Sequence, residues 1–148
     1  MFTDPIPSRE TRSFPAQMRA FPQAAAFIEE VSAAAGFSRD DRHKLTLALE
    51  ELFTNTVMHG YGGDSDQPVW LTVETGIRQI TLHYEDSAPA HNPFERVKMP
   101  DFSVPVDKLQ VGGLGMVLVT KFACHVAYSY SEGRNRLTMI FAPSQPSR

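Results

Sequence analysis

The sequence predicts an α+β fold, a two-layer sandwich in which helices cover one face of a mixed, mostly antiparallel sheet. Two stretches, residues 21–35 and 45–61, carry apolar residues at the three- and four-residue spacing of helices. Two further regions alternate apolar and polar residues on either side of a turn, as hairpins do. A chain of 148 residues, 42% of them hydrophobic, can bury one core. We therefore expect a single domain.

Composition excludes several classes of function. Lys+Arg 14 against Asp+Glu 17 gives a net charge of −3, which does not favour direct binding of nucleic acid. Cys124 is the only cysteine, so an intrachain disulfide and a multi-cysteine zinc site are excluded. The first ten residues lack the pattern of a signal peptide, and no apolar run reaches the roughly 18 residues of a membrane span. We expect a cytoplasmic protein that does not bind membranes.

The N-terminal part of the chain predicts a lead-in, a strand and a helix. Residues 1–11 are polar and proline-rich, which indicates a flexible lead-in to a domain spanning residues 12–142. Residues 13–19 predict a short strand, confined to a sheet edge by Pro15. Residues 21–35 predict a helix with Pro22 in its first turn and Gly36 at its end. Residues 143–148 predict a frayed tail.

The next helix organises the rest of the prediction. Ser38 is expected to cap it, with Asp41 at the third position and Gly60 ending it as a C′ glycine. One face is apolar and comprises Leu45, Ala48, Leu49, Leu52 and Thr56. Glu51 and Asn55 lie four residues apart on a neighbouring face, and His59 extends that line by a turn. The amide oxygen suits Mg²⁺ and the carboxylate suits a general base, although a solvated helix face has the same pattern.

The C-terminal half predicts two hairpins separated by a loop and a helix. The first pairs residues 68–75 with 77–85 across a turn at Gly76 and places Val69, Leu71, Val73, Ile80, Leu82 and Tyr84 on inner faces. Residues 86–110 contain four prolines, which indicates a long functional loop. Residues 111–123 predict a glycine-led helix. The second hairpin pairs residues 127–131 with 136–141 across Glu132-Gly133, and its turn could include Arg134-Asn135.

Two more segments carry chemistry that complements Glu51 and Asn55. Asp86 ends a predicted strand, where a carboxylate can accept a hydrogen bond from an exocyclic amine such as that of adenine. The sequence GGLG (Gly112, Gly113, Leu114, Gly115) opens a helix, where free backbone N–H groups favour phosphate. Each segment alone also fits an ordinary turn or helix cap. Their occurrence together, in this order, indicates a nucleotide site.

At this point the chain resembles the GHKL, or Bergerat-fold, ATPases with a histidine kinase-like ATPase domain. Within them it resembles the bacterial anti-sigma-factor serine/threonine kinases. The matching stretches are EELFTNTVMHGY, HYEDSAPAHNP, VGGLGMVLV and GRNRLTMIF, spread from about residue 14 to 141. The resemblance implies a kinase that binds ATP and Mg²⁺, sequesters a sigma factor and phosphorylates a STAS-type anti-sigma-antagonist. It also implies a homodimer.

The resemblance assigns roles residue by residue. It makes Glu51 the catalytic base, with Glu50 as its rival, and Asn55 the Mg²⁺ ligand. It makes Asp86 the adenine-binding aspartate and places Gly112, Gly113, Leu114 and Gly115 at the phosphates. His59 and Gly60 match the end of the family's first box, and Ala88 falls within the nucleotide-binding segment.

The chain departs from this family at Ala88 and Ala90, where the family has glycines. If those positions need a positive φ or extra room, each methyl group weakens ATP binding; if the backbone is ordinary, the cost is slight. The departure leaves an alternative to the kinase: a partner-switching module of the same fold that is non-catalytic or binds ATP weakly.

Overall fold

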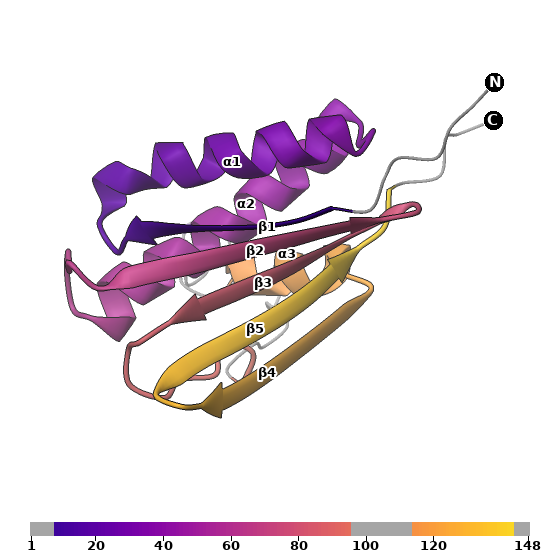
Figure 1. Cartoon of the computed structure of the whole chain (residues 1–148). Coiled ribbons are helices and arrows are strands. Elements are labelled where there is room, and N and C mark those ends of the chain that lie inside the picture. Colours follow the sequence, from indigo (N-terminus) through magenta and orange to yellow (C-terminus); the bar gives the residue numbers. More distant parts are fainter. Residues whose placement is uncertain (1–7, 96–113, 144–148) are drawn as a thin grey trace, which may run out of the picture.

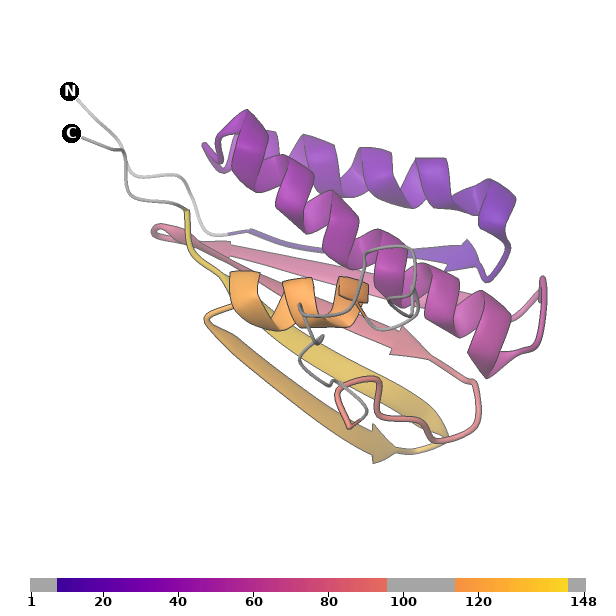
Figure 2. The same cartoon turned by 180° about the vertical axis from the view of Figure 1, so that it is seen from behind.

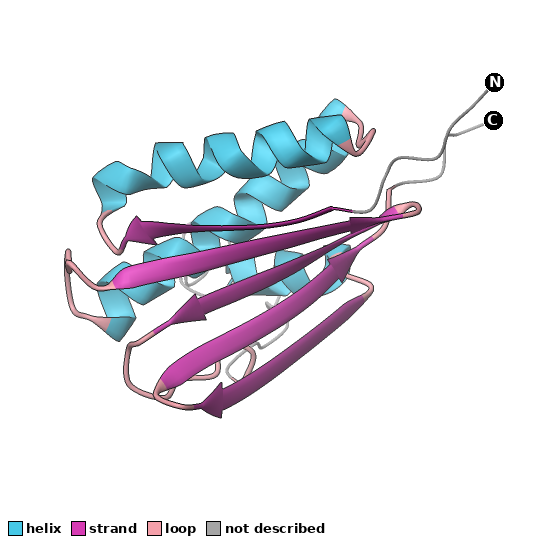
Figure 3. Ribbon diagram, viewed as in Figure 1, coloured by secondary structure: helices cyan, strands magenta, loops and turns pink. Residues whose placement is uncertain are grey.

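The computed structural model describes residues 8–95 and 114–143. In this part of the chain five strands form one sheet, ordered β1-β2-β3-β5-β4, and every neighbouring pair is antiparallel. Figures 1 and 2 show the helices together on one face of the sheet, and Figure 3 separates the two layers by colour. The helices are α1 (Phe21–Ala34), α2 (Arg39–Asn55) and α3 (Leu114–Phe122); the strands are β1 (Ser8–Pro15), β2 (Pro68–Gly76), β3 (Gln79–Asp86), β4 (His125–Ser131) and β5 (Arg134–Phe141). The predicted two-layer α+β fold is confirmed.

The first strand lies earlier in the chain than the sequence predicts. Strand β1 begins at Ser8, not at residue 13, so residues 8–11 of the expected lead-in pair with β2. Its side chains are exposed except for Phe14, so the stretch carries almost no apolar alternation that could reveal a strand. The expected edge position is correct, because β1 pairs only with β2 and Pro15 ends it.

The start of α2 matches its sequence signals. The Ser38 hydroxyl accepts a hydrogen bond from the backbone N–H of Asp41 at 3.2 Å, and Asp40 and Asp41 lie in the first turn. Gly36 has φ +85°, the left-handed conformation that ends α1 and that glycine adopts at low cost. Gly36 and Ser38 therefore fix the tight connection between α1 and α2.

The end of α2 differs from the prediction of a C′ glycine. Residues Thr56–Gly60 form a π-helical turn, and the backbone N–H of Tyr61 donates to the Thr56 carbonyl at 3.0 Å. Gly60 is not among the described glycines with positive φ, which are Gly36, Gly62, Gly63 and Gly133.

Both hairpins form, and only the turn of the first differs from the prediction. The β2–β3 turn is Ile77-Arg78, with Arg78 at φ 60°, while Gly76 still pairs with Gln79. The β4–β5 turn is Glu132-Gly133, with φ 54° and 74°, as a two-residue primed turn requires. Arg134 and Asn135 therefore belong to β5, which decides between the alternatives that the sequence left open.

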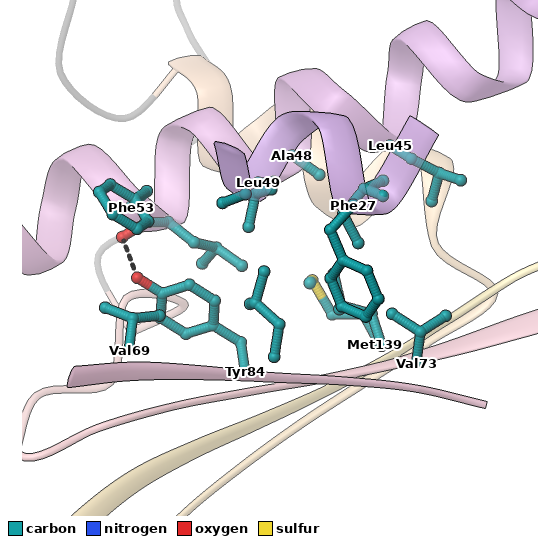
Figure 4. Packing of buried hydrophobic residues seen from close by; sticks show 14 of the residues in the cluster. Phe27, Leu45, Ala48, Leu49, Phe53, Val69, Val73, Tyr84 and Met139 are labelled. Carbon is teal, nitrogen blue, oxygen red and sulfur yellow. Dashed lines mark hydrogen bonds between the residues drawn. The ribbon is translucent and has the colours of Figure 1, made fainter. Parts of the chain in front are cut away.

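The core lies between the helices and the inner face of the sheet. Figure 4 shows Leu45, Leu49 and Phe53 of α2 in the same buried cluster as Val69, Tyr84 and Met139 of the strands. All six predicted inner residues of the first hairpin are buried. In the described part of the chain, no helix is long and apolar enough to cross a membrane.

Candidate functional site

Asp86 is the buried carboxylate around which the site is built. It ends β3 on the inner face of the sheet and is 6% exposed. Its Oδ1 accepts from the Asn135 amide at 2.9 Å and from the Ala88 backbone N–H at 3.1 Å, and its Oδ2 accepts from the Thr56 hydroxyl at 2.8 Å. A carboxylate offers about four lone-pair positions, so these three donors leave one on Oδ2 for a ligand.

Two hydroxyl groups link Asp86 to the end of α2. The Tyr84 hydroxyl lies 2.6 Å from the Thr56 hydroxyl and 3.1 Å from the Leu52 carbonyl, and the second contact is the dashed line in Figure 4. Complete burial raises the pKa of Tyr84 well above its ordinary value, so the phenol stays protonated and donates. Tyr61, just after the π-helical turn, accepts from the Ser87 backbone N–H at 3.1 Å. The helix end and the end of β3 are thus held in one polar network.

A small cavity of about 30 Å³ lies over this network. It holds about one water molecule, so a purine base needs part of the wall to move outward. Its lining joins α2 and the π-helical turn to β3, the following segment and β5: Leu52, Asn55, Thr56, Gly60, Tyr84, Asp86, Ala88, His91, Pro93, Asn135 and Leu137. Four predicted site residues (Asn55, Gly60, Asp86 and Ala88) therefore meet at one cavity.

Ala88 fits its position because of Gly60. Ala88 is 2% exposed, and a Cβ placed on Gly60 would lie 2.9 Å from the Ala88 Cβ, closer than two carbon atoms can approach. Neither Ala88 nor Ala90 has a positive φ, and Ala90 is exposed. The alanines therefore cause no backbone strain, and Gly60 is a glycine for space rather than for conformation.

Glu51 lies one helical turn before Asn55 on α2, outside the lining of the cavity over Asp86. It lines a groove of about 360 Å³ between α2 and α3, together with Leu47, Ala48, Glu50, Thr54, Val119 and Phe122. Burial raises the pKa of Glu51 above its ordinary value, the neighbouring Glu50 raises it further, and His59 opposes the shift. A carboxyl group with a raised pKa beside an open groove suits a general base.

The remaining predicted residues are placed only in part. His59 is exposed on the π-helical turn and acts on Glu51 through its charge. Leu114 and Gly115 lie in the first turn of α3, as expected for residues that open a helix. Gly112 and Gly113 lie outside the described residues, as does the long loop beyond residue 95.

Sequence reasoning missed two residues of the network. Thr56 was assigned to the apolar face of α2, but its hydroxyl donates to Asp86. Asn135 was considered only as part of a turn, whereas its amide donates to the same carboxylate. Extending the alternation of Leu137, Met139 and Phe141 by one step would have placed Asn135 on the inner face, where an amide needs a polar partner.

The side chains agree with a magnesium ion held mainly by a nucleotide. Within residues 8–95 and 114–143, no three His, Cys, Asp or Glu side chains gather into a metal cluster. Mg²⁺ commonly takes one or two protein oxygens, with phosphates and water completing its shell. The Asn55 side chain, next to the cavity over Asp86, fits this kind of site.

Comparison with known proteins agrees with this geometry. Serine/threonine-protein kinase BtrW from Bordetella bronchiseptica is 28% identical over 113 residues, which cover 76% of this chain and 79% of that protein. Serine-protein kinase RsbW from Listeria monocytogenes is 25% identical, covering 72% of this chain and 69% of that protein. The crystal structure of the RsbU and RsbW domains of Rv1364c from Mycobacterium tuberculosis superposes on 95% of this chain with a TM-score of 0.65. At 17% identity that likeness shows the fold alone, and this chain spans about a third, 34%, of the solved chain.

The family model that matches is the histidine kinase-like ATPase domain, over residues 14–141. The match spans the sheet from the end of β1 to the end of β5, and it includes α2 and α3, the helices that line the site. The buried Asp86, the Asn55 beside it and Glu51 in the neighbouring groove lie inside the matched range. This chain belongs to the histidine kinase-like ATPase domain family.

Proposed function

We propose that this chain is an anti-sigma factor with ATP-dependent serine/threonine protein kinase activity. It sequesters a sigma factor and phosphorylates a STAS-type anti-sigma-antagonist, in the cytoplasm and as a homodimer. The observation that carries the proposal is the placement of Glu51 and Asn55 one turn apart on α2, with Asn55 lining the cavity over Asp86 and Glu51 lining the neighbouring groove. The two relatives named above as protein kinases support the same activity.

The residues divide the work of phosphoryl transfer between them. Asp86 accepts the adenine amine on Oδ2 and positions the base. The amide oxygen of Asn55 would hold Mg²⁺, and the ion would supply positive charge that neutralises the phosphates. Glu51 accepts the proton of the substrate hydroxyl as its oxygen bonds to the γ-phosphorus. The bond from that phosphorus to the β,γ-bridging oxygen breaks, and ADP leaves with the electron pair.

The raised pKa of Glu51 predicts how activity depends on pH. Glu51 acts as a base only when ionised, and its pKa lies above the ordinary glutamate value. Phosphorylation should therefore fall as the pH drops through that raised pKa and should level off above it. A base with an ordinary pKa would keep its activity to a lower pH.

Glu51→Gln should lower phosphate transfer by about 10²- to 10⁴-fold, because glutamine cannot accept the proton. ATP affinity should change little, since the shape of the side chain is kept. The assay uses γ-³²P-labelled ATP and the STAS-domain proteins of the native host. Glu50→Gln is the matched control, because Glu50 lines the same groove.

Full transfer by Glu51→Gln together with loss in Glu50→Gln would assign the base to Glu50. Absence of transfer to every STAS-domain protein, with ATP bound, would favour the non-catalytic binding module.

A further inference from the structure

Asn135 is a buried amide in a row of core residues. It precedes Leu137, Met139 and Phe141 on the inner face of β5 and is 5% exposed. A primary amide has two hydrogens to donate and an oxygen that can accept two bonds. Leaving these groups unpaired in a core is costly, so the partners of Asn135 indicate what the residue does.

Each atom of the Asn135 amide meets partners of the right kind. Its Nδ2 lies 2.9 Å from Asp86 Oδ1, 3.0 Å from the Ala88 carbonyl and 3.2 Å from the Pro89 carbonyl, all acceptors. Its Oδ1 accepts from the Tyr128 hydroxyl at 2.6 Å and from the His91 backbone N–H at 2.9 Å. Reversing the amide would oppose like groups at four of its five contacts, and only the Tyr128 hydroxyl could adapt, so the orientation of the amide is fixed by its surroundings.

These contacts tie three separate parts of the chain together. Asn135 comes from β5, Tyr128 from β4, and the other partners from the end of β3 and the segment that follows it. By contrast, residues 92–95 form a local turn, in which the Phe94 N–H donates to Asn92 Oδ1 at 2.9 Å and the Glu95 N–H to the Asn92 carbonyl at 3.2 Å. Pro93 in that turn also lines the cavity over Asp86. The Asn135 amide therefore holds the part of the cavity wall that lies next to Asp86, through the Ala88 and Pro89 carbonyls and the His91 backbone N–H.

We propose that Asn135 is a positioning residue for the nucleotide base. Its amide holds the Asp86 carboxylate and the backbone of residues 88–91 in place, so that Oδ2 of Asp86 stays available for the exocyclic amine. This inference rests on the proposed function, because it takes adenine as the base that Asp86 receives. Asn135 acts through Asp86 and has no role in the transfer step itself.

Asn135→Asp tests the inference without changing the shape of the side chain. It replaces an N–H donor with a carboxylate at the 2.9 Å contact to Asp86. Two carboxylates this close hold one shared proton, with a raised pKa for the pair. Below that pKa the proton bridges the pair; above it the two charges repel. Calorimetry with ATP·Mg²⁺ should show affinity reduced roughly ten- to a hundredfold at pH 8 and partly restored towards pH 5.5.

Other groups around Asp86 do not produce this pH dependence. Tyr61, Tyr84 and Tyr128 face it, and burial raises the pKa of each above its ordinary value, outside this range. His91 lines the cavity but is present in every variant, so the wild-type titration accounts for it and for protonation of ATP. Tyr128→Phe is the matched control, because it removes one bond to Asn135 Oδ1 and leaves the donor to Asp86.

A second measurement works without nucleotide. In Asn135→Leu the backbone N–H groups of Ala88 and His91 should exchange with solvent faster than in the wild type, because the amide no longer secures that segment. Wild-type affinity at all pH values in Asn135→Asp, or a loss that no pH restores, would overturn the inference. Unchanged exchange in a folded Asn135→Leu protein would do the same. A wild type that does not bind ATP would overturn the proposed function, and the exchange at Ala88 and His91 would still decide whether Asn135 holds the segment.

Discussion

Asp86→Asn should abolish measurable binding of ATP while leaving the protein folded. The substituted amide still offers one oxygen to Asn135 and Ala88, which donate to Oδ1 of Asp86 at 2.9 and 3.1 Å. Its NH₂ group takes the place of Oδ2, the oxygen proposed to receive the adenine amine, so two donors would face each other. We expect affinity to fall about a hundredfold or more, since the variant loses a bond to a charged group and gains an unpaired donor.

The measurement is calorimetric titration with ATP·Mg²⁺, with thermal unfolding to confirm the fold. Glu85→Gln is the matched control, because it changes the net charge by the same amount. Glu85 precedes Asp86 on β3, so its side chain points to the opposite face of the sheet. Equal ATP affinity in Asp86→Asn and the wild type would show that the base binds elsewhere.

Gly60→Ala should destabilise the protein by about 1–3 kcal/mol, because the new Cβ forces apart a packed contact. The added carbon would lie 2.9 Å from the Ala88 Cβ. Ala88→Gly should cost about 1 kcal/mol through the lost buried methyl and the added freedom of the unfolded chain. Together the two changes only move one methyl group from residue 88 to residue 60. The double variant should therefore be close to the wild type in stability.

Chemical denaturation of the wild type, Gly60→Ala, Ala88→Gly and the double variant measures the coupling between residues 60 and 88. A coupling free energy of at least about 2 kcal/mol is expected, because each single cost disappears in the double variant. Ala90→Gly is the control, because Ala90 is exposed and has an ordinary φ. Additive effects would mean that the Gly60 and Ala88 backbones separate easily, and the explanation of why an alanine fits at position 88 would fail. ATP affinity should not improve in Ala88→Gly, since there is no left-handed backbone there to relieve.

The sequence predicts the fold well at positions where one local interaction or conformation explains the residue type. Ser38 as a cap, Gly36 at the end of α1 and the inner-facing residues of the first hairpin follow from local rules, and the structure confirms them. The first five residues of β1, 8–12, escaped prediction because an edge segment of exposed side chains has no apolar alternation to read. The pairing of β1 with β2 joins segments that are far apart in the sequence, so local patterns do not reveal it.

The sequence predicts part of the lining of the cavity over Asp86 and less of its packing. Asn55, Gly60, Asp86 and Ala88 meet at one cavity, as the resemblance implies. The reason for Gly60 was predicted wrongly, because a glycine next to a helix end looks the same whether it serves conformation or space. Asn135 was missed because the sequence fits a hairpin turn of two residues or of four, and the strand register shows that the turn has two and that Asn135 belongs to β5.

The most direct test of the account is whether the wild-type protein binds ATP with the help of magnesium in spite of its two alanines. Calorimetry should compare ATP with Mg²⁺, ATP with a chelator, and GTP with Mg²⁺, in the wild type and in Asn55→Ala. We predict measurable binding of ATP that Mg²⁺ strengthens in the wild type and much less in Asn55→Ala. GTP should bind far more weakly, because its base presents an oxygen to Asp86 where adenine presents an amine. Equal affinity for ATP and GTP, or the same gain from Mg²⁺ in both proteins, would contradict the account.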